Sequence, residues 1–253
     1  MAKKIIIGNW KMNPATKEEA GDIFFRIALG IRGLKKVSIV VCIPAIFIEA
    51  IGSLKLKGLS MGAENCFFDE IGPYTGEVSP TQLKNFGVSY VILGHSERRV
   101  LGEDNELISK KIKSAVKSGL KVIFCVGENS RDEAGEYLNF IRAEVVDGLS
   151  KIKKEDLKNL IIAYEPIWAI GKNAIRPATP EDAHQATLFL KKILVEIFGR
   201  DSGLKIPIIY GGSVDRNNAD DMLRYGAVDG LLVGRESLNS EKFVEIANIA
   251  NNI

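Results

Sequence analysis

The sequence predicts an α/β protein in which eight parallel strands, each followed by a helix, close into a single-domain (β/α)8 barrel over residues 1–253. Three observations favour this fold. Short apolar runs recur about eight times, a helix-like stretch follows each run, and units of roughly 30 residues fill the chain. An open, doubly wound sheet of similar units is the alternative that this spacing leaves open.

The predicted strands are continuous apolar runs rich in valine and isoleucine, which are typical of parallel strands covered on both faces. No linker rich in proline, glycine or serine separates them, so one domain is the simpler interpretation. In chain order the runs are Ile5–Ile7, Val37–Ile43, Leu59–Ala63, Tyr90–Leu93, Val122–Val126, Leu160–Tyr164, Ile206–Tyr210 and Gly230–Val233.

Capping patterns predict where several of the intervening helices begin. Ser79 precedes a proline and is followed three residues later by Gln82, which predicts a capping box, and Gly87 is a suitable stop for that helix. The segments 16–19 and 179–182 have the same arrangement of a threonine with an acidic residue three positions on. Strand followed by helix is therefore the predicted repeating unit.

Composition excludes several classes of function. Lysine and arginine number 34 against 32 acidic residues, so no large net field attracts nucleic acid or an anionic membrane. The longest apolar run, from Val37 to Ile51, contains Pro44 and Glu49 and is too short to span a bilayer. The first residues lack the pattern of a secretory signal. We therefore expect a cytoplasmic protein without a membrane or nucleic-acid partner.

The three cysteines lack the close spacing of metal ligands, and each lies in or beside an apolar run. We expect reduced, buried thiols and no metal site. These residues are Cys42, Cys66 and Cys125.

Polar side chains gather just after the predicted strands. In a barrel, the loops that leave the carboxyl ends of the strands build the active site, so these residues are candidates to converge there. A carboxylate, an imidazole and an ammonium are among them. The candidates are Asn9 and Lys11 after the first run, His95 and Glu97 after the fourth, Glu165 after the sixth, Ser213 after the seventh, and Gly234 after the eighth.

Glycine-rich turns lie at the ends of the last two predicted strands, at residues 210–213 and 232–234. Barrels often bind phosphate there through backbone N–H groups, and glycine permits the close approach that this requires. Either turn alone is also compatible with an ordinary tight turn. Both together favour a phosphate site.

Longer motifs resemble the triosephosphate isomerase family across nearly the whole chain. Their order and spacing make them far more specific than a short pattern. Gly8–Asn13 and Gly94–Arg99 resemble the family's first-strand and fourth-strand motifs, and Ala163–Gly171 its catalytic glutamate and mobile lid. Tyr210–Val214 resembles its phosphate turn, and Asn65–Glu77 its dimer loop.

The resemblance implies the family's TIM-barrel fold and the interconversion of dihydroxyacetone phosphate and D-glyceraldehyde 3-phosphate by proton transfer through an enediolate. This reaction belongs to glycolysis and gluconeogenesis and needs no metal or organic cofactor. The resemblance assigns the base to Glu165 and a neutral donor to His95, roles that general accounts of this family already describe. It assigns a positive charge to Lys11, an amide donor to Asn9, and the orientation of Lys11 to Glu97.

The resemblance also implies that Gly171, Ser213 and Gly234 bind the phosphate beneath a closing lid. Two departures from the family pattern affect this part of the site. The segment Lys172–Ala178 makes the lid about two residues longer, and Arg235 replaces the second glycine of the last turn. We expect the longer lid still to close. We also expect Arg235 to have an ordinary φ or to lie near the phosphate entrance.

The dimer loop implies a homodimer in which Thr75 reaches toward the partner's Asn9 and the partner's Lys11. Two other functions are the alternatives. One is another phosphate-binding barrel enzyme, such as one of the tryptophan or histidine pathways, which would lack the Asn9, Lys11, His95 and Glu165 set. The other is a sugar-phosphate sensor that retains the pocket without turnover.

Overall fold

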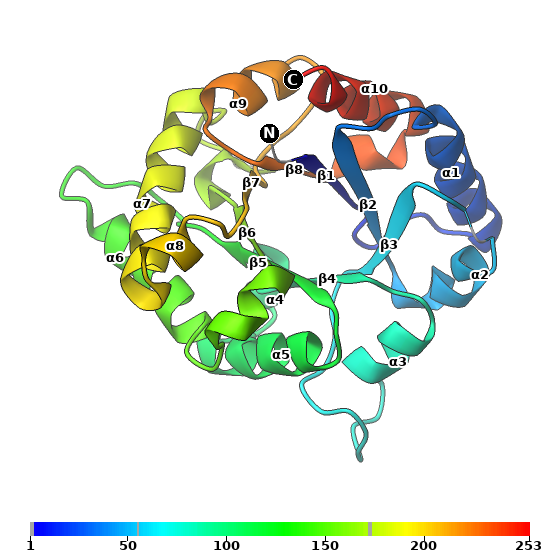
Figure 1. The fold of residues 1–253 in the computed structure, drawn as a ribbon, viewed down its shortest axis with the longest axis horizontal. Helices are drawn as coiled ribbons and strands as arrows, with labels where there is room; N and C mark the ends of the chain where they lie inside the picture. The colour runs from blue at the N-terminus through cyan, green and yellow to red at the C-terminus, as the bar shows by residue number, and fades with distance from the viewer. Residues whose placement is uncertain (1–2, 55, 172–173) are drawn as a thin grey trace.

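Eight parallel strands form a closed barrel in the order β1 to β8, and helices surround it (Figure 1). The computed structural model describes residues 3–54, 56–171 and 174–253. Because β1 pairs with both β2 and β8, the open sheet is excluded. The strands are β1 (Lys4–Asn9), β2 (Val37–Ile43), β3 (Leu59–Ala63), β4 (Tyr90–Leu93), β5 (Lys121–Val126), β6 (Leu160–Tyr164), β7 (Ile208–Tyr210) and β8 (Gly230–Val233).

Five of these strands have the predicted bounds, and the other three differ at their ends. Strands β1 and β5 begin one residue earlier than predicted, and β1 also continues to Asn9. The prediction that the seventh strand begins at Ile206 is wrong, because β7 begins at Ile208. Pro207 lacks the N–H that a ladder requires, although its carbonyl still accepts the Ile162 N–H at 2.9 Å.

The helices alternate with the strands and cover the outside of the barrel (Figure 1). They are α1 (Lys17–Gly30), α2 (Ile48–Gly52), α3 (Pro80–Asn85), α4 (Ser96–Val100), α5 (Asn105–Lys117), α6 (Glu136–Gly148), α7 (Pro180–Phe198), α8 (Arg200–Gly203), α9 (Ala219–Tyr225) and α10 (Ser240–Asn251). Short 3₁₀ helices are η1 (Ala45–Phe47), η2 (Lys154–Asn159), η3 (Ile167–Ala169) and η4 (Arg235–Leu238).

The predicted caps explain where several helices begin. Ser79 and Thr179 form complete capping boxes at the starts of α3 and α7. At α1 the Thr16 hydroxyl accepts the Glu19 N–H, which is one half of the predicted box. Gly87 lies just beyond α3 with φ 84°, a conformation that glycine adopts without strain, so it is the predicted stop.

The apolar residues form two layers, because successive side chains of a strand point to opposite faces of the sheet. The inner layer fills the barrel with side chains such as Ile7, Val40, Ile92, Ile123 and Leu232. The outer layer packs the other strand faces against the helices. All three cysteines are buried free thiols, as predicted. No helix within the described ranges is long and apolar enough to cross a membrane.

Candidate active site

A cavity of about 780 Å³ opens at the carboxyl ends of the strands. Parallel strands all end at this rim, so residues distant in the sequence meet there. The cavity brings together all nine site residues that the sequence predicts: Asn9, Lys11, His95, Glu97, Glu165, Gly171, Ser213, Gly234 and Arg235.

Glu165 follows β6 directly and is 2% exposed. Its backbone N–H donates to the Val126 carbonyl at 2.8 Å, which extends the ladder to β5 and fixes the start of the loop. Its carboxylate accepts the Ser96 N–H at 3.2 Å, while the other oxygen lies 3.3 Å from His95 Nε2. The carboxylate is thus held between two short contacts in a largely water-free position.

His95 caps the short helix α4, and this position fixes its tautomer. Its Nδ1 accepts the Glu97 N–H at 3.2 Å. A nitrogen that accepts a backbone N–H carries no proton itself, so the proton of the ring is on Nε2. Nε2 faces Glu165 across the cavity. The ring therefore presents a neutral N–H donor to whatever occupies the pocket.

Lys11 lines the same pocket from the end of β1, on an unusual backbone. Its φ is 56°, a conformation that a residue with a side chain rarely adopts. The Asn9 side chain accepts the Lys11 N–H at 3.1 Å, and Glu97 Oε1 lies 2.6 Å from Lys11 Nζ. Strain of this kind persists where the surroundings fix the residue, and it is concentrated at functional sites.

The remaining predicted residues, Gly171 among them, line the same cavity. The Ser213 hydroxyl donates to the Ala169 carbonyl at 3.0 Å, which joins the β7 turn to the segment after β6. Gly234 follows β8 near the stem of Lys11. Arg235 lines the cavity and, as expected, is not among the described residues with positive φ.

Comparisons with known proteins agree with this geometry. The family model described as triosephosphate isomerase matches residues 4–250. The chain belongs to the triosephosphate isomerase family. It is 42% identical to the triosephosphate isomerase of Carboxydothermus hydrogenoformans, covering 97% of this chain and 98% of that one. It is 40% identical to the triosephosphate isomerase of Fusobacterium nucleatum, covering 99% of this chain and 100% of that one.

A solved structure shows the same fold. The crystal structure of triosephosphate isomerase from Bartonella henselae is 33% identical, matches with a TM-score of 0.86, and covers 98% of each chain. The chain is thus an isomerase of this family, with the family's closed eight-stranded barrel.

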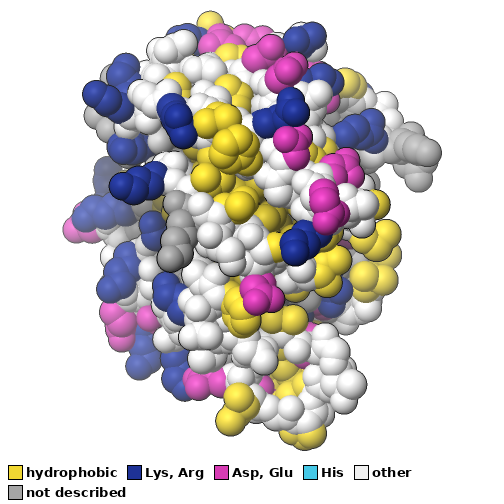
Figure 2. Space-filling view, turned by 90° about the vertical axis from the view of Figure 1, so that its right-hand side faces the viewer, with side chains coloured by type: hydrophobic (Ala, Val, Ile, Leu, Met, Phe, Trp, Pro, Cys, Tyr) yellow, Lys and Arg dark blue, Asp and Glu magenta, His cyan; other side chains and the backbone are white. Residues whose placement is uncertain are grey.

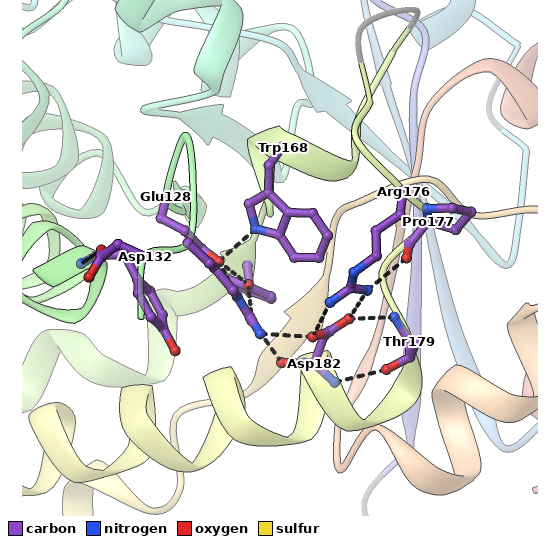
Figure 3. Close-up of polar contacts among 10 residues, drawn as sticks. Glu128, Asp132, Trp168, Arg176, Pro177, Thr179 and Asp182 are labelled. Atoms are coloured by element: carbon purple, nitrogen blue, oxygen red, sulfur yellow. Dashed lines mark hydrogen bonds and ion pairs between the residues drawn. The ribbon is translucent and has the colours of Figure 1, made fainter. Parts of the chain in front are cut away.

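The segment that follows Glu165 is bound to the barrel by a network of hydrogen bonds (Figure 3). The Trp168 indole N–H donates to Glu128 at 2.8 Å, and Tyr164 and Arg131 donate to the same carboxylate oxygen. The Arg131 guanidinium also lies 5.2 Å from the Trp168 ring centre. Trp168, in the predicted lid, is therefore attached to the barrel by its indole.

A second arginine fixes the far end of the predicted lid segment. Arg176 forms two hydrogen bonds with Asp182, at 2.6 and 3.0 Å, and its guanidinium lies 4.6 Å from the Trp168 ring centre (Figure 3). Burial alone would raise the pKa of Asp182, but the hydrogen bonds from Arg176 and Thr179 lower it to about 2. Lys172 and Asn173, at the predicted longer tip, lie outside the described residues.

Three carboxyl groups near the site were missed by the sequence reasoning. Glu64 follows β3, Glu128 follows β5, and Glu144 lies on α6. Burial raises the pKa of Glu64 to about 8 and that of Glu144 to about 7. Glu64 and Glu128 could have been found from the sequence, because each comes just after a predicted strand. Glu144 occupies the apolar face of its helix with Ile141 and Val145, a pattern that signals burial.

Within the described ranges, no group of three His, Cys, Asp or Glu residues is arranged to hold a metal ion.

Glu64 makes the stability of the fold dependent on pH. The folded protein keeps this proton up to about pH 8, whereas the unfolded chain releases it near 4.5. The free energy of unfolding should therefore fall as pH rises from 4.5 to 8. We expect Glu64→Gln, which has no proton to lose, to be more stable by about 2 kcal/mol at pH 8, a value reduced to allow for partial solvent screening.

Urea unfolding at pH 5 and pH 8, at one protein concentration, tests this expectation. The difference between variant and wild type should be small at pH 5 and large at pH 8. Equal differences at the two pH values would contradict the assignment of the raised pKa to Glu64.

Proposed function

We propose that Glu165, His95 and Lys11 interconvert dihydroxyacetone phosphate and D-glyceraldehyde 3-phosphate in this pocket. The observation that carries the proposal is the convergence of a buried carboxylate, a neutral imidazole N–H and an ammonium on one cavity. The reaction moves a carbonyl to the neighbouring carbon, which requires a base for the carbon-bound proton and donors for the oxygen that gains negative charge.

Glu165 takes the proton from the carbon beside the carbonyl, and the electrons of the broken C–H bond form the enediolate. The carboxylic acid then returns the proton to the adjacent carbon. The His95 Nε2–H and the Lys11 ammonium stabilise the negative oxygen, and proton transfer between the two oxygens completes the exchange. Because Glu165 and His95 lie side by side on the wall of the cavity, with 3.3 Å between a carboxylate oxygen and Nε2, a substrate bound against both meets base and donor together.

The phosphate group anchors the substrate away from the reacting carbons. We assign it to the backbone N–H groups of Gly171, Ser213 and Gly234, with Arg235 adding positive charge at the entrance. Asn9 orients the Lys11 backbone, and Glu97 orients its ammonium. Closure of the lid over the phosphate would exclude water and protect the enediolate.

A coupled assay with each triose phosphate tests this function. We expect turnover in both directions without added metal or cofactor. A sugar-phosphate sensor would bind both compounds without turnover, and a different phosphate-binding barrel enzyme would ignore both. Either result would reject the proposal. We place the reaction in glycolysis and gluconeogenesis, in the cytoplasm, without a nucleic-acid partner.

We further propose that two copies of the chain associate through the loop Asn65–Glu77. This loop, between β3 and α3, projects beyond the barrel, and Figure 2 shows hydrophobic side chains at its tip. Ile71 is 89% exposed there. Exposed apolar side chains also follow the neighbouring strands β1, β2 and β4, and large exposed apolar side chains grouped on one side of a protein are typical of an interface. They are Met12, Ile46, Val100 and Leu101.

In this homodimer Thr75 would reach toward the partner's Asn9 and the partner's Lys11. Analytical ultracentrifugation should give twice the mass of one chain. We expect Ile71→Asp to shift the protein toward monomers, because a charge would be buried in the interface. Leu188→Asp, at an exposed site on α7, is the control and should remain dimeric. A monomeric wild type would reject the proposal.

A further inference from the structure

Glu144 is a buried carboxyl group to which the proposed chemistry gives no role. It lies on α6 and is 2% exposed. A carboxyl group is rarely buried unless other groups bind it. One oxygen accepts the Gly127 N–H at 2.8 Å, and the other lies 3.2 Å from Arg99 Nε. Glu144 also lines the active-site cavity.

The first of these contacts fixes the backbone beneath the base. Gly127 packs so closely against Glu165 that a Cβ atom on Gly127 would collide with the Glu165 carbonyl. The residue before it, Val126, accepts the Glu165 N–H at 2.8 Å. By binding the Gly127 N–H, the Glu144 carboxylate therefore holds in place the backbone against which Glu165 packs at the end of β6.

The second contact reaches the turn that carries the imidazole. Arg99 Nε donates to the Gly94 carbonyl at 2.9 Å, and Gly94 immediately precedes His95. The other guanidinium nitrogens donate to Asn105 at 2.6 Å and to the Cys125 carbonyl at 3.5 Å. Arg99 thus links the turn that carries His95 to Glu144, whose carboxylate forms an ion pair with the guanidinium.

We propose that Glu144 is a positioning residue, which joins the backbone beneath Glu165 to the turn that carries His95. This inference rests on the proposed function of that site. It adds a group that acts through its neighbours and does not touch substrate.

The charge of Glu144 changes near neutral pH. Burial raises its pKa to about 7, against the opposing effects of Arg99 and the Gly127 N–H, while Glu165 and Glu128 raise it further. The charged groups that face Glu144 are thus Arg99 from α4, Glu165 from the end of β6 and Glu128 from the end of β5. Above pH 7 the ionised carboxylate holds Arg99. Below pH 7 the neutral acid holds it more weakly, so the two active-site segments lose part of their mutual alignment.

Steady-state kinetics of Glu144→Gln between pH 6 and 8.5 test the proposal. The amide still accepts the Gly127 N–H but cannot ionise. We expect kcat to fall about tenfold at pH 8.5 with KM nearly unchanged, because misplacement of catalytic groups affects the chemical step. The ratio of wild-type to variant kcat should shrink toward one as pH falls through 7. Glu136→Gln, an exposed carboxyl on the same helix, is the control and should match wild type.

A ratio that stays constant with pH, or a variant equal to wild type, would overturn the proposal. The wild-type protein provides a second measurement that requires neither the variant nor isomerase activity. In ¹³C-glutamate and histidine NMR, the Glu144 carboxyl should titrate near pH 7, and the His95 ring signals should shift with the same midpoint. A His95 ring that does not respond to that titration would also reject the proposal. An inactive wild type with a coupled titration would instead reject the proposed function alone.

Discussion

Glu165→Gln should lower kcat at least a thousandfold, because an amide cannot take the proton that the reaction removes from carbon. The variant should fold, since its side-chain oxygen can still accept the Ser96 N–H that the carboxylate accepts at 3.2 Å. Binding of a phosphate-bearing inhibitor should change little, because the phosphate is assigned to the other end of the cavity. The coupled isomerase assay and an inhibitor titration measure the two effects separately.

Glu165→Asp is the matched control. It keeps the negative charge but withdraws the carboxylate by one methylene, so the loss should be smaller, on the order of a hundredfold. A Glu165→Gln enzyme that retains more than a hundredth of wild-type kcat would show that another group is the base.

Lys11→Met should lower kcat/KM by a factor on the order of a thousand. Methionine replaces most of the apolar stem but removes the charge that faces the substrate phosphate and oxygen. Because methionine must adopt the same φ of 56°, the backbone strain is retained and stability should change little. Glu97 loses its cation, but its side chain is 58% exposed, so water can solvate it.

Steady-state kinetics and thermal unfolding of the same preparation separate these effects. Lys17→Met, at the exposed start of α1, is the control and should behave as wild type. A Lys11→Met enzyme whose kcat/KM is within tenfold of wild type would remove Lys11 from the proposed machinery.

The strands and helix starts could be predicted from the sequence because their causes are local. A doubly covered parallel strand needs a continuous apolar run, and Val37–Ile43 has one over the full length of β2. Ser79 and Gln82 form a capping box within four residues. The predicted start of β7 was wrong because it was taken from the apolar pattern alone. That pattern takes no account of Pro207, which lacks the N–H that a strand ladder requires.

Seven of the nine pocket residues could be predicted because a barrel places the carboxyl ends of all its strands at one rim, whereas Gly171 and Arg235 came from the family resemblance. The charge states of Glu64 and Glu144 could not be predicted from the sequence. A raised pKa arises from desolvation by residues distant in the sequence, as when Arg99 and Gly127 meet Glu144. The attachment of Arg176 to Asp182 and Trp168 likewise depends on tertiary contacts that no local pattern encodes.

The placement of the two tryptophans gives this protein a built-in optical reporter. Trp10 is fully buried, and its indole donates to the Ser237 carbonyl beyond β8. Trp168 lies at the lid base, in contact with two guanidinium groups and a carboxylate. Fluorescence from Trp10 should therefore be a constant background, whereas emission from Trp168 should change whenever its contacts with Arg131, Arg176 or Glu128 change, without any attached dye.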